Sequence, residues 1–199
     1  MPLPSVISLQ AVEKRYGRKR ALLPVDLELS HRSFLVVTGA NGSGKTTLLR
    51  LLVGLAAPTR GELQVSVERG RLGYLGHEAL VYRDLTALEN LDLYGRLYRV
   101  PERRERIGML LERFGLWESR RERAGSFSRG MLQRLALCRT FLHGPELLVL
   151  DEPFTALDAE GAALLDRQLA ELREACTIVL STHEPKRVEH LCSDRLALT

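Results

Sequence analysis

Apolar and polar residues in the first half of the chain follow the repeats of strands and of one helix. Alternation with period two indicates a half-buried strand, whereas leucines that recur every three or four positions indicate a helix face. By these criteria residues 48–55 form a helix. The strands expected on the same grounds are residues 8–13, 23–29, 33–38, 61–67 and 72–75.

The second half begins with a helical stretch and then returns to strands. Residues 86–114 have a helical period, and Pro101 divides them into two helices. Residues 146–150 are a continuous apolar run that ends at Asp151, which is typical of a buried strand. The other elements expected are helices at residues 128–142, 158–174 and 185–191 and a strand at residues 176–181.

This order of elements predicts an α/β fold. Strands that alternate with helices at both ends favour a mostly parallel core sheet with helices on its faces, after an N-terminal antiparallel β part. A chain of 199 residues has the size of a single domain. We therefore predict one domain over residues 1–199, with a core of about 1–85 and 136–199 and an inserted helical subdomain of about 86–135.

One loop between a predicted strand and a predicted helix has the pattern G-x-x-x-x-G-K-S/T, which binds phosphate. Its glycines let backbone N–H groups turn toward an anion, and the following helix N-terminus adds partial positive charge. Lys45 can reach the β- and γ-phosphates of a nucleotide, and the Thr46 hydroxyl suits Mg²⁺. The candidate nucleotide-binding residues here are Gly39, Ala40, Asn41, Gly42, Ser43, Gly44, Lys45, Thr46 and Thr47.

Two acids end the buried strand at residues 146–150. A carboxylate at the C-terminal end of such a strand holds Mg²⁺ beside the phosphate loop in P-loop ATPases, and we assign this role to Asp151. Glu152 is one residue further along and points differently. It is therefore the candidate general base, able to polarise an attacking water.

Further segments resemble the ATPases of ATP-binding-cassette (ABC) transporters. Residues 126–134, Ser-Phe-Ser-Arg-Gly-Met-Leu-Gln-Arg, are similar to the signature segment of that family, and residues 156–158, Ala-Leu-Asp, resemble its D-loop. His183, at the end of a predicted strand, matches the switch histidine of the family. Tyr16 matches the aromatic residue that stacks on adenine. Together with the phosphate loop, these segments cover nearly the whole chain in the order that the family has.

The resemblance implies a mechanism. Members of the family form a head-to-tail homodimer with two ATP molecules, and with Mg²⁺, at the interface. Ser128 and Gly130 would contact the γ-phosphate of the ATP held by the partner chain, while Glu152 and His183 would act in catalysis. The ATPase would energise export through separate integral membrane permease subunits. It would then lie peripherally on the cytoplasmic side of the cell membrane.

Two departures from the family pattern point to a subfamily. His77 stands where the family usually has a Gln that contacts Mg²⁺ and the attacking water, and an imidazole can also hydrogen-bond a water. Arg129 and Met131 replace a Gly and the Gln of the signature. With residues 76–78 and 85–91, these features resemble the ATP-binding subunit of the haem exporter of cytochrome c maturation. Thr86 with Glu89, inside the last segment, is also the pattern of a helix capping box.

Other functions remain open at this stage. An ATPase subunit of a drug or polysaccharide exporter of the ABC-2 type fits the same motifs, and exposed apolar residues within 79–98 would dock a helix of the membrane partner. A soluble cassette ATPase acting on nucleic acid has only the arginine-rich residues 99–134 in its favour, and we expect no direct nucleic-acid partner. A non-catalytic nucleotide-binding module is disfavoured because Lys45, Asp151 and Glu152 are all present.

Composition adds few constraints. The net charge is +4, and residues 99–134 hold ten Arg and five Glu, so the rest of the chain is nearly neutral. The longest apolar stretches are far shorter than the ~20 residues that span a bilayer, and residues 1–9 do not resemble a secretion signal. Cys138, Cys176 and Cys192 are widely spaced, which predicts reduced, packed thiols and no zinc site.

Overall fold

The structure is a computed structural model that describes residues 5–199, and it divides into two compact units. The first, here called the strand unit, comprises residues 5–76, Glu146–Pro153 and Leu172–Thr199. The second, the helical unit, comprises His77–Pro145 and Phe154–Glu171. Within residues 5–199, no helix is both long and apolar enough to cross a bilayer.

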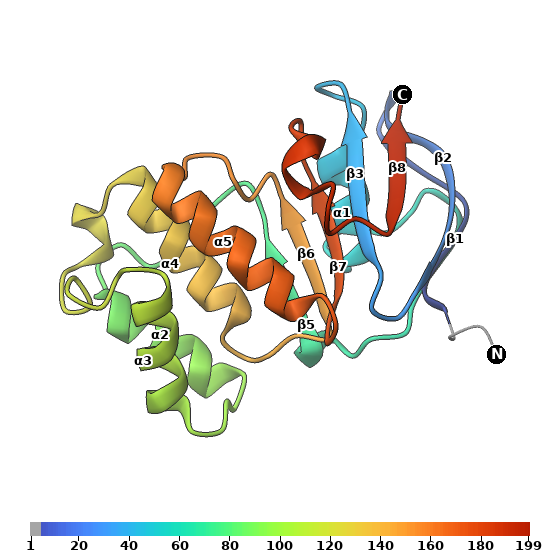
Figure 1. The fold of residues 1–199 in the computed structure, drawn as a ribbon. Coiled ribbons are helices and arrows are strands. Elements are labelled where there is room, and N and C mark those ends of the chain that lie inside the picture. Colours follow the sequence, from blue (N-terminus) through green and yellow to red (C-terminus); the bar gives the residue numbers. More distant parts are fainter. Residues whose placement is uncertain (1–4) are drawn as a thin grey trace. The chain divides into compact units, whose positions relative to one another are not determined.

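The strand unit contains two sheets (Figure 1). The antiparallel sheet has the order β2-β1-β4, formed by β1 (Ser5–Tyr16), β2 (Lys19–Ser30) and β4 (Arg60–Val65). The other sheet has the order β5-β6-β7-β3-β8 and every pairing in it is parallel. Its strands are β3 (Phe34–Gly39), β5 (Leu72–Leu75), β6 (Leu147–Asp151), β7 (Thr177–Ser181) and β8 (Asp194–Leu198). Helix α1 (Lys45–Leu52) follows β3.

An apolar core of buried residues holds these sheets and α1 together. Leu48, Leu49, Leu51 and Leu52 of α1 are buried in it, as the helical spacing of the leucines predicted. The whole of β6 and the whole of β7 are buried, which is why these strands are continuous apolar runs without alternation. The predicted α/β fold, with a parallel sheet and an N-terminal antiparallel part, is confirmed.

Parallel pairing brings the carboxyl ends of the strands to one edge of the sheet. Asp151 of β6 pairs with Ser181 of β7, and Val37 of β3 pairs with the same serine. Two residues beyond Val37, β3 ends at Gly39, the first residue of the glycine-rich loop. Residues far apart in the sequence are therefore neighbours at this edge.

Three sequence predictions need correction. Strands β1 and β2 are longer than residues 8–13 and 23–29, because they form one hairpin whose pairing continues through charged residues to Tyr16 and Lys19. Strand β8 was not predicted, since a five-residue segment gains its extended form from pairing with β3. The helix expected at 185–191 is a 3₁₀ turn, Pro185–Val188. The other short turns are Arg69–Arg71 and Ala124–Ser126.

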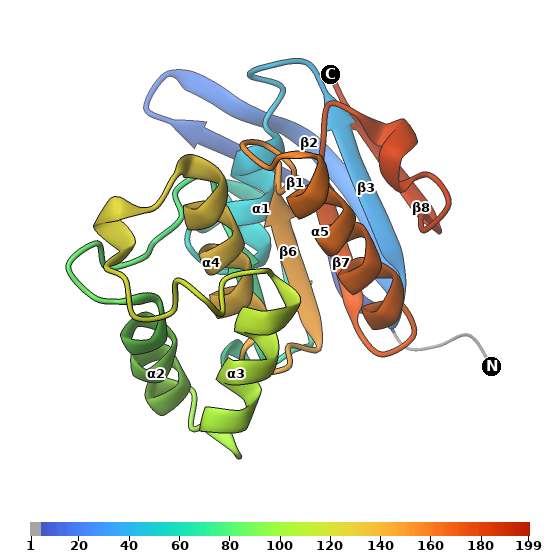
Figure 2. The same ribbon diagram turned by 60° about the vertical axis from the view of Figure 1, so that its left-hand side comes forward.

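The helical unit contains α2 (Ala87–Leu97), α3 (Arg103–Arg113), α4 (Arg129–Phe141) and α5 (Ala159–Leu172), the last ending at the first residue of the next strand-unit segment. Figure 2 shows α2, α3 and α4 side by side. The break at Pro101 between α2 and α3 is confirmed. Thr86 and Glu89 form the reciprocal capping box at the start of α2, so the structural reading of that pair is also confirmed.

Buried Asn90 organises the segment that precedes α2. Its side chain accepts from the amide of Tyr82 (2.8 Å) and donates to the carbonyl oxygens of Tyr82 (2.9 Å), Leu85 (3.3 Å) and Thr86 (2.9 Å). Asn90 is 1% exposed, so water does not easily take the place of its side-chain amide as the hydrogen-bond partner of these backbone groups. Residues 82–86 therefore have a defined course although they are not in a helix or strand.

We expect Asn90→Ala to lower the free energy of unfolding by about 2–4 kcal/mol, because the hydrogen bonds of a buried side chain to four backbone groups are lost at once. Urea denaturation followed by circular dichroism measures this loss. The control is Leu88→Ala, since Leu88 is on the same helix but 38% exposed, and we expect it to change stability by less than about 1 kcal/mol. Equal stability of the two variants would show that Asn90 does not hold the segment.

The cysteines are free thiols, as predicted. Cys138 and Cys176 are buried, and Cys192 is partly buried. Burial raises the pKa of Cys176 to about 12, so this thiol stays protonated at neutral pH and is a poor nucleophile. No group of three or more His, Cys, Asp or Glu residues suited to a metal ion occurs within residues 5–199.

Candidate active site

The glycine-rich loop joins the end of β3 to the start of α1, as the sequence predicted. All three glycines of the loop have a positive φ, including Gly42 (φ +86°), and two of them also have no room for a side chain. Gly39 (φ +150°) and Gly44 (φ +104°) adopt conformations that L side chains rarely take, and a Cβ would lie 2.6 Å from the carbonyl oxygen of Leu198 or Ala21, respectively. Gly44 caps α1 without a side chain, so the first amide groups of the helix point to the loop without a competing acceptor from the cap.

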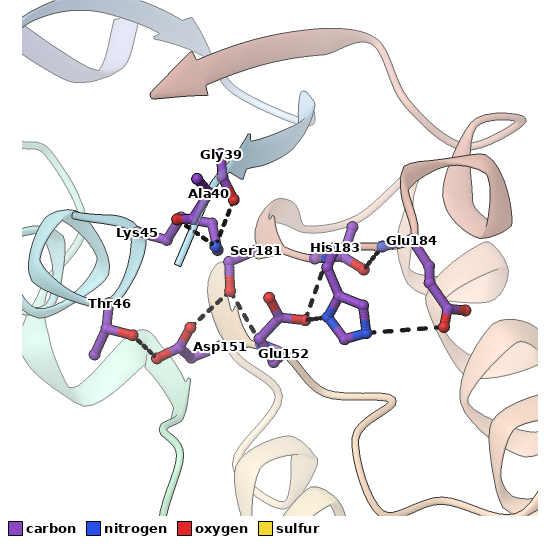
Figure 3. Close-up of polar contacts among 10 residues, drawn as sticks. Gly39, Ala40, Lys45, Thr46, Asp151, Glu152, Ser181, His183 and Glu184 are labelled. Atoms are coloured by element: carbon purple, nitrogen blue, oxygen red, sulfur yellow. Dashed lines mark hydrogen bonds and ion pairs between the residues drawn. The ribbon is translucent and has the colours of Figure 1, made fainter. Parts of the chain in front are cut away.

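Lys45 lies over this loop. Its ammonium donates to the carbonyl oxygens of Gly39 (2.8 Å) and Ala40 (3.4 Å), as Figure 3 shows. The residue is only 9% exposed. A buried cation beside an amide-lined loop attracts phosphate oxygens, which accept hydrogen bonds from both.

Thr46 and Asp151, which are 105 residues apart in the sequence, are directly hydrogen-bonded: the threonine hydroxyl donates to Oδ2 of Asp151 at 2.7 Å. The other carboxylate oxygen, Oδ1, accepts from the Ser181 hydroxyl at 2.6 Å (Figure 3). Asp151 is 4% exposed, so its two neighbours orient a carboxylate that solvent hardly reaches. Two oxygen ligands of the kind that Mg²⁺ prefers thus lie side by side at the phosphate loop.

Ser181 is a site residue that the sequence analysis missed. Its hydroxyl donates to Asp151 and accepts from the amide of Glu152 at 3.0 Å. It therefore aligns the two neighbouring acids. The available signal was a serine that ends a buried apolar strand beside β6, at the edge where the other polar residues lie.

Glu152 and His183 form a hydrogen-bonded pair next to Asp151. Glu152 has a left-handed backbone (φ +48°), which turns its side chain away from that of Asp151. Its Oε2 lies 2.8 Å from Nδ1 of His183 and 3.3 Å from the backbone nitrogen of the same residue. A neutral imidazole that donates from Nδ1 leaves Nε2 as an acceptor. The Glu152 side chain is 21% exposed and that of His183 is 64% exposed, so both are accessible from solution.

Tyr74 lies near the carboxylate of Asp151. Burial, and secondarily the negative charge of Asp151, raise the pKa of its phenol, whereas a hydrogen bond and the charge of Arg50 lower it by less. The phenol consequently stays neutral and can donate a hydrogen bond. Tyr16, the last residue of β1, is 51% exposed, and both tyrosines belong to the strand unit.

The signature-like residues lie in the helical unit. Ser128 caps α4, with its hydroxyl accepting from the amide of Met131 at 3.2 Å. Gly130 lies close to the carbonyl oxygen of Ala156, because a Cβ on this glycine would be 3.2 Å from that oxygen. Asp158 accepts from the amide of Gly161 at 2.8 Å near the start of α5. His77 is the first residue of the helical unit and is exposed.

Comparisons with known proteins agree on the family. The family model described as ABC transporter matches residues 22–155. The chain belongs to the ABC transporter family. Among solved structures it is similar to a dimeric ATP-binding cassette in a post-hydrolysis state bound to ADP and phosphate. That likeness has a TM-score of 0.86 and 26% identity, over 97% of this chain and 94% of the solved one.

Curated relatives give the same picture. A daunorubicin resistance ATP-binding protein from Streptomyces coeruleorubidus is 36% identical over 98% of this ABC domain, which covers 65% of that relative. A Nod factor export ATP-binding protein from Rhizobium johnstonii is 33% identical over 98% of this chain and 66% of its own length. The chain therefore spans slightly less than two thirds of the length of these relatives.

Proposed function

We propose that this ABC ATPase domain energises export through a separate membrane permease. The observation that carries the proposal is the hydrogen bond between Thr46 and Asp151 next to the phosphate loop. Glu152, the residue after Asp151, is paired with His183. The phosphate loop, two oxygen ligands for a metal ion and a carboxylate that can act as a base therefore lie at the same edge of the sheet. In this scheme residues 1–199 act as one ATPase domain whose helical subdomain is the block of about 86–135.

Thr46 and Asp151 would hold Mg²⁺ together with the phosphates. When bound, the ion neutralises charge that builds up on the phosphates during transfer. The donor set fits, because a hydroxyl and a buried carboxylate at 2.7 Å from each other are oxygen ligands suited to a hard cation. Ser181 keeps the carboxylate oriented, and Lys45 and the loop amides bind the β- and γ-phosphate oxygens. Tyr16 stacks on the adenine.

Glu152 accepts the proton of the attacking water. The hydrogen bond from His183 places its carboxylate, and the histidine acts as the switch that the family motif implies. His77 stands at the sequence position of the usual Gln, and by the family resemblance its imidazole would hydrogen-bond the attacking water. These roles rest on the family resemblance together with the geometry of the Glu152–His183 pair.

A second copy of the chain completes each site in this proposal. Ser128 and Gly130 of one protomer contact the γ-phosphate bound to the loop of its partner, in a head-to-tail homodimer. The cap at Ser128 supports this role, because it opens a 13-residue helix whose N-terminus attracts anions. The dimeric state of the solved relative also supports it.

The decisive experiment is ATP hydrolysis by the purified chain in Mg²⁺, alone and with membranes that contain its permease, together with sedimentation in ATP. We expect Mg²⁺-dependent phosphate release and an ATP-dependent dimer. A wild-type chain that releases no phosphate in either preparation would refute the proposal.

The permease docks, in this proposal, on the segment that precedes α2 and on the start of that helix. Leu80, Tyr82 and Leu88 are 51%, 53% and 38% exposed, which is high for large apolar side chains. The contacts of Asn90 and the hydrogen bond from the Tyr94 hydroxyl to the carbonyl of Leu80 (2.9 Å) hold the segment in place. A rigid apolar surface of this kind is suited to a helix of a membrane partner. The ATPase would thus lie at the cytoplasmic face of the membrane.

We expect Leu80→Ser with Tyr82→Ser to reduce by at least about tenfold the amount of chain that co-purifies with detergent-solubilised permease, since two exposed apolar anchors are lost. Quantitative pull-down measures it. The control is Leu97→Ser, because Leu97 is 67% exposed at the opposite end of α2. Wild-type capture by the double variant would refute docking at this surface.

The proposal also concerns the compound that is exported. The names of the relatives, daunorubicin resistance and Nod factor export, favour an exporter of the ABC-2 type over a haem exporter. Haem export for cytochrome c biogenesis, which residues 76–78 and 85–91 suggested, has the support of these short segments alone, and the capping box accounts for part of the second. Deletion of the gene separates the two, since loss of c-type cytochromes follows only if haem is the cargo.

A further inference from the structure

One face of the Tyr16 ring is covered by a cation. The ammonium of Lys14 lies over the ring, 4.9 Å from its centroid. The two residues are two positions apart on β1, and this contact shows that their side chains lie on the same side of the strand. Because Tyr16 is 51% exposed, it still has surface open to a ligand.

The position of Lys14 is maintained by contacts away from the ring. Its ammonium donates to the carbonyl oxygen of Ala57 at 2.8 Å. On both sides of Lys14 the backbone is bound to Thr59: the amide of Arg15 donates to the Thr59 hydroxyl (3.0 Å), and the amide of Thr59 donates to the carbonyl of Glu13 (2.8 Å). The end of β1 is therefore tied to the segment that follows α1, the helix that begins at Lys45.

Glu13, the acidic neighbour of Lys14 in the sequence, forms ion pairs with two arginines instead. The Glu13 carboxylate, which is buried, faces Arg15 at 3.4 Å and Arg60 at 3.6 Å. Lys14 thus combines one neutral hydrogen-bond acceptor, the Ala57 carbonyl, with the electron-rich face of the Tyr16 ring. This is the geometry in which a cation–π contact is favourable.

We propose that Lys14 is a positioning residue for the nucleotide base: it fixes the Tyr16 ring from one side and strengthens the stacking of a purine on the other. The inference rests on the proposed function, in which Tyr16 stacks on adenine. Two effects contribute. The ammonium restrains the rotation of an exposed ring, which would otherwise lose freedom when the base binds. It also draws ring electrons toward itself, which reduces the repulsion between the opposite face and the π-electrons of the base.

The test compares a ligand with a base and one without. Isothermal titration gives the Kd values of ADP and of inorganic pyrophosphate for the full chain and for Lys14→Met, which removes the charge but keeps the length. We expect Lys14→Met to weaken ADP binding by about two- to fivefold, the size of an exposed cation–π contact, and to leave pyrophosphate binding unchanged. Lys14→Arg retains a cation and is expected to restore ADP binding.

A second background shows whether the effect passes through the ring. In Tyr16→Leu, which has no ring, we expect Lys14→Met to cause no further loss of ADP affinity, whereas in Tyr16→Phe the loss persists. An unchanged or tighter Kd for ADP in Lys14→Met, an equal loss with pyrophosphate, or a full loss in the Tyr16→Leu background each overturns the inference. If Tyr16→Leu itself binds ADP like the wild type, the assigned role of Tyr16 is wrong. If the wild type does not bind ADP, the proposed function fails as well.

Discussion

Glu152→Gln is expected to slow ATP hydrolysis by about 10²–10⁴-fold, the loss typical of removing a general base, while ATP still binds. An amide has nearly the shape of the carboxylate and can still meet His183 Nδ1, whose distance to Oε2 is 2.8 Å, but it cannot take a proton from water. Binding persists because the loop at residues 39–46, Lys45 and Asp151 are unchanged. Phosphate release under saturating ATP, with a separate binding titration, measures the two effects.

The matched control for this variant is Glu184→Gln. Glu184 is also near His183, with 3.8 Å between its Oε1 and Nε2 of the histidine, but its side chain is 69% exposed and faces away from Asp151 and the loop (Figure 3). We expect its turnover to stay within about twofold of the wild type, since exposed ion pairs contribute little. We also expect Glu152→Gln to accumulate as an ATP-bound dimer in gel filtration. Normal turnover by Glu152→Gln would remove this residue from the role of base.

Lys45→Ala is expected to weaken nucleotide binding itself by about 10²-fold or more, because charged hydrogen bonds to phosphate are each worth about 1.5–3 kcal/mol. The ammonium already lies at the loop, bound to the carbonyls of Gly39 and Ala40, so little rearrangement is needed when phosphate oxygens arrive. Equilibrium binding of a fluorescent ATP analogue measures the change in Kd.

Lys186→Ala serves as the control for charge, because it removes another lysine of the strand unit from an exposed position in the turn Pro185–Val188. We expect it to bind nucleotide like the wild type. Circular dichroism of both variants separates lost binding from lost folding, since Lys45 is largely buried and Lys186 is not. Equal affinities in Lys45→Ala and the wild type would place the phosphates elsewhere.

Much of the fold was predictable from the sequence because local pattern and tertiary structure agree. The buried strand β6, the leucine-rich α1 and the break at Pro101 follow directly from periodicity. The failures have a common cause in long-range pairing. β8 is extended because it pairs with β3, and the charged ends of β1 and β2 are extended because the hairpin continues to Tyr16, neither of which a local window detects.

In the candidate site, too, the residues that form a local motif were predictable, whereas a contact between distant segments was missed. Loop residues 39–46 are adjacent in the sequence, and their motif identifies them without the fold. The proximity of Thr46 and Asp151 was expected, because the phosphate-loop motif and the likeness to P-loop ATPases assigned both residues to Mg²⁺. The role of Ser181 was missed because a serine at a strand end has many ordinary uses, and only the neighbouring strand shows what it contacts.

The absence of a side chain at Gly39 has a practical consequence for handling this protein. Gly39 pairs with Leu198 in the parallel sheet, and the Leu198 carbonyl comes so close that a single added carbon would collide with it. A fluorophore on a cysteine introduced at residue 199 would therefore lie one residue from the pair of strands that borders the phosphate loop. Such an attachment makes a sensitive reporter of ligand arrival, and a poor choice of handle when an unperturbed enzyme is wanted.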